Sequence, residues 1–315
     1  MNSTISSLPY RCHTLEESDE WLGELEDKGY TVVNVASEGE VEKARDLLWN
    51  WLSDLGTGIK RSDPSSWTDE SWPDWPGYKK YGNCKSEGGA HQEAAWFLRG
   101  LPRLKMVFQN IYKTEDLIVS MDGIIVWRSW RSWKEDEART PTSSRLHMDQ
   151  NPFTKPGFQC VQGMLPLYPV TPEIGGTLVV PGSHLHQEKF RTKYPDWSSH
   201  ERDFCALNDD DPLYGSERLV PLQPGDILLW DSRLVHCGRV GDGGDPGELA
   251  RASLCVCMGP RDRASSEVLQ KRREALKEGW SFSHWPWEAR YINGQVSVTS
   301  RYQQPTLTQD QWRLI

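Results

Sequence analysis

The sequence predicts an all-β core, built as a sandwich or a barrel, with helices on both sides of it along the chain. Between residues 116 and 260, short apolar and β-branched segments alternate with Gly- and Pro-containing turns, as in antiparallel all-β proteins. In the flanking regions, apolar residues recur at helical spacing instead. The 315 residues contain no internal repeat and are enough to bury one large core. We therefore expect a single domain, with a helical cover and loop over 1–115, the β core over 116–260, and a helix and extension over 261–315.

The elements before the core begin with a helix. Thr14 and Glu17 have capping-box spacing, which predicts a helix that starts there and continues to Leu25, with a stop at Gly29. The other elements expected here are a strand over 30–35, a helix over 37–55, a long loop over 57–90 and a helix over 91–113 that is broken at 100–102.

The core itself contains six predicted strands, each an apolar segment bounded by turn residues. They are residues 117–120, 124–130, 158–168, 177–183, 227–236 and 253–258. After Pro260, residues 264–279 form a basic amphipathic pattern that predicts a further helix, and the remaining segment is polar and extended.

Charge and composition narrow the class of partner. With 36 Lys and Arg against 45 Asp and Glu, the net charge of −9 and the lack of a basic stripe disfavour nucleic acid and anionic membranes. No apolar run reaches the length of a membrane span, and residues 1–10 do not resemble a signal peptide. The seven cysteines lack metal-site spacing and are expected to be reduced thiols. We expect a cytoplasmic protein, a monomer or weak homodimer, that acts on a small molecule.

Three residues have the spacing of a metal site. His147 and Asp149 are two apart at the start of a β region, so on a strand their side chains share one face. His236, at the end of the predicted strand over 227–236, is the candidate third ligand. Two histidines and one carboxylate form the facial triad of non-haem Fe(II) oxygenases, which leaves positions open for a co-substrate and O₂.

An arginine and a serine suggest what the co-substrate is. Arg251 and Ser253 are also two apart on a predicted strand, and an Arg fork with a nearby hydroxyl binds a carboxylate well. An Arg that points into a β core without an anion would be a costly buried charge. The distal carboxylate of 2-oxoglutarate would supply that anion. The alternative is an Arg at the rim, paired with an acidic residue of the segment over 241–248.

Several segments together resemble the phytanoyl-CoA dioxygenase family of Fe(II)/2-oxoglutarate oxygenases. In chain order they are DLIVSMDG (116–123), LHMDQNP (146–152), VQGMLPL (161–167), GGTLVVPGSH (175–184), LQPGDILLWDSRLVHCG (222–238) and RASLCVC (251–257). The resemblance covers residues 90–260 and implies a double-stranded β-helix, the jelly roll of cupin-like proteins. It also implies that His147, Asp149 and His236 bind iron.

By the same resemblance, Arg251 anchors 2-oxoglutarate. The insert between His236 and Arg251 leaves Arg239 as a second candidate, but three residues after His236 it would lie on the opposite face of a continuing strand. Asp149 is present where related halogenases have Ala or Gly, which favours oxygenation. Gln162 is a polar residue in an apolar strand and a candidate contact for cofactor or substrate.

The predicted activity is that of an Fe(II)/2-oxoglutarate-dependent dioxygenase. It would use O₂ to oxidise an unactivated C–H bond of a small polar or anionic metabolite, by hydroxylation, desaturation or ring closure, and release succinate and CO₂. Arg128 and Arg131 are candidate contacts for 2-oxoglutarate or substrate, because related enzymes place a cationic or polar side chain on this strand. The alternatives are an acyl-CoA or protein hydroxylase of the same class, a redox-silent cupin-type metal protein, and a metal-free binding module.

Overall fold

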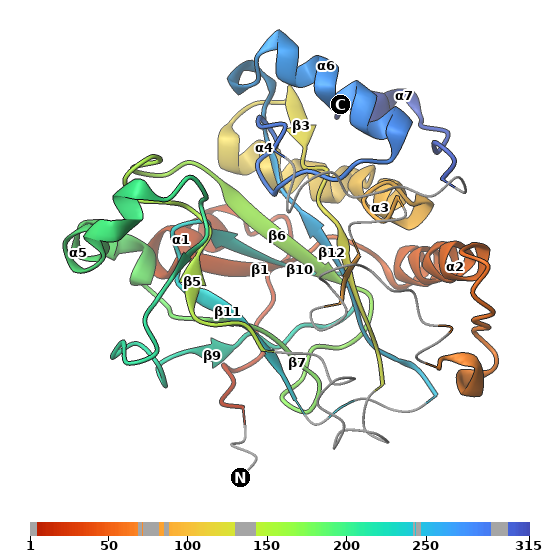
Figure 1. Ribbon diagram of the computed structural model, residues 1–315, viewed down its shortest axis with the longest axis horizontal. Coiled ribbons are helices and arrows are strands. Elements are labelled where there is room, and N and C mark those ends of the chain that lie inside the picture. Colours follow the sequence, from red (N-terminus) through yellow and green to blue (C-terminus); the bar gives the residue numbers. More distant parts are fainter. Residues whose placement is uncertain are drawn as a thin grey trace.

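The computed structural model describes residues 5–68, 71, 82–84, 88–129, 143–241, 243, 247–290 and 302–315. Two antiparallel sheets form its centre (Figure 1). The larger sheet has the order β1 (Tyr30–Asn34), β10 (Asp226–Asp231), β6 (Val161–Pro166), β12 (Leu249–Val256), β4 (Ile124–Arg128) and β2 (Asn83–Cys84). The smaller sheet has the order β8 (Cys205–Ala206), β5 (His147–Met148), β11 (His236–Val240), β7 (Gly175–Val179) and β9 (Arg218–Leu219). A separate ribbon pairs β3 (Leu117–Val119) with β13 (Met258–Pro260).

Successive strands alternate between the two sheets. The chain passes from β4 in the large sheet to β5 in the small one, then to β6 and back to β7, and it repeats this alternation from β10 through β11 to β12. Such alternation winds the chain into a double-stranded β-helix. The predicted all-β jelly-roll core with flanking helices is therefore confirmed.

The two faces of the large sheet have different partners. Along β10, Ile227 and Leu229 belong to the cluster that packs on the helices, whereas Leu228 and Trp230 belong to the cluster between the sheets. This is the period-two alternation of a sheet that is covered on both faces. Side chains of even number on β10 and β6 therefore point to the small sheet.

Most helices cover the outer face of the large sheet. These are α1 (Ser18–Lys28), α2 (Glu38–Asp54), α3 (Glu93–Arg99), α4 (Pro102–Tyr112) and α6 (Ser266–Glu278), all with buried residues in one shared cluster. The short α5 (Gln187–Lys193) lies on the other side of the molecule from α2 and α3, and α7 (Gln309–Trp312) lies near α6 (Figure 1). In the part of the chain that the structure describes, no helix has the length and apolar character needed to cross a bilayer.

Two predicted boundaries are wrong. The first helix begins at Ser18, because the 14–17 segment forms a turn in which the backbone N–H of Thr14 donates to the Glu17 carboxylate (2.6 Å). The predicted strand over 227–236 is two strands. β10 ends at Asp231, where the carboxylate accepts the backbone N–H of Arg233 (2.8 Å) and the backbone carbonyl accepts that of Leu234 (2.8 Å). This turn carries the chain to the other sheet, so His236 begins β11 instead of ending the preceding strand.

Candidate metal centre

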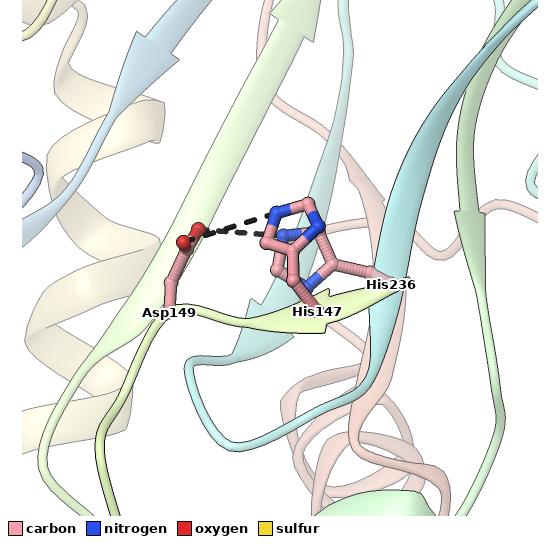
Figure 2. Close-up of side chains that lie close together, drawn as sticks. All are labelled: His147, Asp149 and His236. Carbon is pink, nitrogen blue, oxygen red and sulfur yellow. Dashed lines mark ion pairs between the residues drawn. The ribbon is translucent and has the colours of Figure 1, made fainter. Parts of the chain in front are cut away.

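The three predicted metal ligands lie together between the sheets. His147 and His236 stand directly opposite each other in the β5–β11 pair, and Asp149 follows β5 by one residue. The Asp149 carboxylate is 3.8 Å from Nε2 of His147 and 3.4 Å from Nε2 of His236 (Figure 2). One candidate ligand atom from each residue lies within 4.8 Å of the others. This donor set suits a transition metal with open coordination positions.

Backbone contacts orient both imidazoles. Nδ1 of His147 lies 2.7 Å from the carbonyl oxygen of Arg145, and Nδ1 of His236 lies 2.9 Å from that of Leu234. A carbonyl oxygen only accepts hydrogen bonds, so each Nδ1 carries the proton and donates it. Each Nε2 is then the nitrogen with the free lone pair, and Figure 2 shows both rings turned towards Asp149.

Their surroundings keep His147 and Asp149 in metal-binding protonation states. Burial, with a smaller contribution from His236, lowers the pKa of His147 to about 4, so its imidazole is neutral at pH 7. Burial alone would raise the pKa of Asp149, but its close contacts with His236 and His147 outweigh this effect and hold that pKa well below its usual range. A neutral imidazole and an ionised carboxylate are the forms that bind metals.

Gln162 contacts one of the candidate metal ligands. It lies on β6, and its Nε2 donates to Oδ2 of Asp149 over 3.2 Å. The amide therefore orients the candidate metal-binding carboxylate. Residues that hold ligands in this way commonly affect metal affinity.

Arg251 and Ser253 lie on the inner side of β12. Arg251 is 3% exposed, and its guanidinium stacks on the Trp127 ring, 4.6 Å from the centroid. Its Nε lies 3.4 Å from Oγ of Ser253 and its Nη2 lies 2.8 Å from Sδ of Met164. No carboxylate of the described residues forms an ion pair with it. Burial lowers its pKa to about 10, so Arg251 is a buried cation at pH 7 that no carboxylate of the described part of the chain neutralises.

The other candidate arginines lie elsewhere. Arg239 is on the face of β11 opposite to His236 and pairs with Glu217 at 2.8 Å. Arg128 follows Trp127 on β4, and its Nη1 donates to the backbone oxygen of Trp67, a residue of the helix-side cluster. Arg128 therefore does not join the group between the sheets. Arg131 lies outside the described residues.

Sequence reasoning missed two residues near the centre. Phe204, just before β8, is half exposed, and its ring lies 4.6 Å from that of His147, centroid to centroid. His284 has a pKa lowered chiefly by burial, and Asp149 is the nearby charge that most opposes this shift. Asp203, adjacent to Phe204, bonds Lys155 (2.7 Å), which also pairs with Glu288 (2.6 Å). These ion pairs join the loop before β8 to the segment after α6, and no motif in the sequence announced this contact.

A double-stranded β-helix that holds two histidines and a carboxylate close to a buried arginine is the arrangement of Fe(II)/2-oxoglutarate-dependent dioxygenases. The family model of phytanoyl-CoA dioxygenase (PhyH) matches residues 110–239, which include all three candidate ligands. The match confirms the resemblance that the motifs predicted, and the donor set of His147, Asp149 and His236 fits iron.

Known proteins resemble the chain, two of them over most of its length and a third over a shorter stretch. It is 28% identical over 286 residues to Ava biosynthesis cluster protein O of Aspergillus versicolor, covering 86% of this chain and 87% of that protein. It is 33% identical over 104 residues to the multifunctional dioxygenase prhA of Penicillium brasilianum, covering 30% of each. Among solved structures, the non-heme α-ketoglutarate-dependent carbocyclase SnoK from nogalamycin biosynthesis shares the fold, with a TM-score of 0.51 and 19% identity over 79% of this chain and 87% of that one.

Proposed function

We propose that His147, Asp149 and His236 hold Fe(II) and that Arg251 with Ser253 binds the distal carboxylate of 2-oxoglutarate. The observation that carries this proposal is the buried Arg251 guanidinium, which has no carboxylate partner among the described residues. A charge buried in this way is costly unless an anion meets it. Its contact with Met164, on the same face of β6 as Gln162, joins it to the side chain that holds Asp149.

The reaction proposed is oxidation of an unactivated C–H bond of a small metabolite. Bound iron, with 2-oxoglutarate and O₂, supplies the oxidising power; in hydroxylation one oxygen atom enters the substrate and the other enters succinate as CO₂ is released. The protein binds and orients both organic molecules and excludes water from the centre. Desaturation or ring closure would follow from the same hydrogen abstraction.

The rim of the site supports a substrate with an apolar face. Phe204 offers an exposed ring directly beside His147, and small-molecule sites combine such surfaces with few polar groups. Two cations that could have favoured an anionic substrate are engaged elsewhere: Arg145 pairs with Asp209 (3.0 Å) and Arg128 bonds Trp67. We therefore favour a largely uncharged ring-containing metabolite. The names of Ava biosynthesis cluster protein O and SnoK refer to biosynthesis, which agrees with a small metabolite as the substrate.

The first test is of the metal and co-substrate. The protein is reconstituted with Fe(II) without oxygen, and 2-oxoglutarate is added while the visible charge-transfer band is recorded. We expect one Fe(II) per chain and the band in the wild type, and neither in His236→Ala. The exposed His200 of the loop before β8 supplies a matched control, His200→Ala. An iron-loaded His236→Ala variant with an unchanged band would refute the assignment, and a redox-silent metal protein or binding module would give no band at all.

The second test is of the substrate. Succinate release is screened with ring-containing metabolites, amino acids and their N-alkyl derivatives, acyl-CoA esters and peptides. We expect turnover with free ring-containing molecules and a raised KM in Phe204→Ala. Turnover with acyl-CoA esters alone, or with peptides or proteins alone, would instead assign the enzyme to lipid or protein hydroxylation.

A further inference from the structure

Two buried polar side chains of the segment 230–232 have no hydrogen-bond partner among the described residues. Trp230 is 4% exposed and Ser232 is fully buried, yet Nε1 of Trp230 and Oγ of Ser232 bond no atom of the described residues. A buried donor without a partner costs free energy, so such groups call for an explanation. Both side chains are donors that a ligand oxygen could satisfy.

Both residues lie next to candidate metal ligands. Trp230 pairs with Gln162 across β10 and β6, and its ring centroid lies 5.3 Å from that of His236. Ser232 follows two residues later, and its backbone carbonyl accepts the N–H of Asp149 (3.3 Å). The Trp230 ring therefore neighbours one candidate metal ligand, and the Ser232 backbone bonds another.

The chemistry of 2-oxoglutarate supplies a matching acceptor. Arg251 contacts Met164, and Gln162 contacts Asp149. Met164 and Gln162 are two residues apart on β6, which separates their Cα atoms by roughly 7 Å and sets the distance between the arginine and the metal centre. A dicarboxylate that is held by Arg251 at one end presents its other carboxylate at the metal centre. Any oxygen of that carboxylate that does not bind the metal is buried and needs a hydrogen-bond donor.

We propose that the indole N–H of Trp230 and the hydroxyl of Ser232 bind the metal-proximal carboxylate of 2-oxoglutarate. This inference rests on the proposed anchor at Arg251 and adds two positioning residues at the opposite end of the co-substrate. It gives Trp230 a role that phenylalanine, with the same ring packing but no donor, could not fill.

The test measures binding and needs no substrate. Zn(II)-loaded protein, in which the metal is redox-inactive, is titrated with 2-oxoglutarate by calorimetry, and its affinity for Zn(II) is measured separately. Trp230→Phe keeps an aromatic ring and removes the N–H, and Ser232→Ala removes the hydroxyl. Trp96→Phe is the matched control, because Trp96 in α3 is equally buried and its Nε1 also has no partner, but it lies in the helix-side cluster.

We expect Trp230→Phe to weaken 2-oxoglutarate binding about tenfold and Ser232→Ala to weaken it severalfold, with Zn(II) affinity unchanged and Trp96→Phe like the wild type. An unchanged affinity in both site variants, an equal loss in Trp96→Phe, or a parallel loss of Zn(II) affinity would overturn the inference. If binding in the wild type is absent or does not depend on Arg251, the proposed function fails as well. Binding that depends on Arg251 but not on Trp230 or Ser232 removes this inference alone.

Discussion

Replacement of Arg251 by methionine tests whether this arginine binds a ligand or stabilises the fold. The guanidinium is buried, its pKa is lowered to about 10 by that burial, and no carboxylate of the described residues pairs with it. Methionine has a similar length, carries no charge and would fill the same space against Trp127 and Met164. The free energy of unfolding should therefore change by less than about 1 kcal/mol, or rise.

The same replacement should nearly abolish co-substrate binding. A bidentate pair of charge-assisted hydrogen bonds contributes about 3 kcal/mol, which corresponds to about a hundredfold rise in the Kd for 2-oxoglutarate. Arg239→Met is the matched control with the opposite pattern. It leaves the buried Glu217 carboxylate without its 2.8 Å partner, so it should lower the free energy of unfolding by about 1 to 3 kcal/mol and leave the Kd within twofold.

Two measurements on each variant decide the matter: urea denaturation of the metal-free protein and calorimetric titration of the metal-loaded protein with 2-oxoglutarate. The reasoning is refuted if Arg251→Met destabilises the protein by more than about 2 kcal/mol while its Kd stays near that of the wild type, because Arg251 would then be a structural residue. A large loss of affinity in Arg239→Met would move the anchor to β11.

Three further predictions concern other parts of the molecule. Gln162→Leu frees the Asp149 carboxylate and should weaken metal binding tenfold to a hundredfold in a chelator competition; unchanged affinity would exclude an orienting role. Arg272, fully buried in α6, donates to four backbone oxygens, and Arg272→Met should lower the free energy of unfolding by about 4 kcal/mol in urea with 2-oxoglutarate binding intact; a cost under about 1 kcal/mol would contradict this. Burial, and next the charge of Arg99, lowers the pKa of His91 to about 3, whereas the unfolded imidazole takes up its proton near pH 6.5. The unfolded state therefore binds more protons below that pH, so this group should lower the free energy of unfolding by about 3 kcal/mol between pH 6.5 and 4. His91→Gln should flatten the pH dependence of unfolding; an unchanged pH dependence would show that His91 titrates normally.

Local patterns were sufficient to find the candidate metal ligands and the fold class. Spacing by two placed His147 and Asp149 together because strand geometry is regular, and the turn-bounded apolar segments revealed the core. Strand geometry also predicted that Arg239 lies on the face of its strand opposite to His236, and the structure shows it there. The face on which a side chain lies relative to its neighbours is determined within one strand, so it can be predicted from a single sequence.

Properties that depend on two strands were not accessible in this way. Which face of β4 turns inward is set by its pairing with β12, and this pairing places Trp127, not Arg128, beside Arg251. The hydrogen bond from Gln162 to Asp149 and the position of Trp230 beside His236 likewise join segments from opposite sheets. In the sequence Trp230 resembles any other apolar residue of its strand, and it is its position beside His236, together with an Nε1 that bonds no described residue, that distinguishes it.

The carbonyl oxygens that hold Nδ1 of His147 and His236 belong to residues two positions earlier on the same segments, so both rings are aimed before any ion arrives. A centre prepared in this way offers the same three donors to every divalent ion that reaches it. Affinity then follows the general order in which Ni²⁺, Cu²⁺ and Zn²⁺ bind nitrogen and oxygen donors more tightly than Fe²⁺ does. Nothing in this donor set rejects the tighter-binding ions, so the fraction of active enzyme should depend on the metal supply during expression. Purification on nickel resin should load part of the protein with Ni²⁺ and inactivate that part.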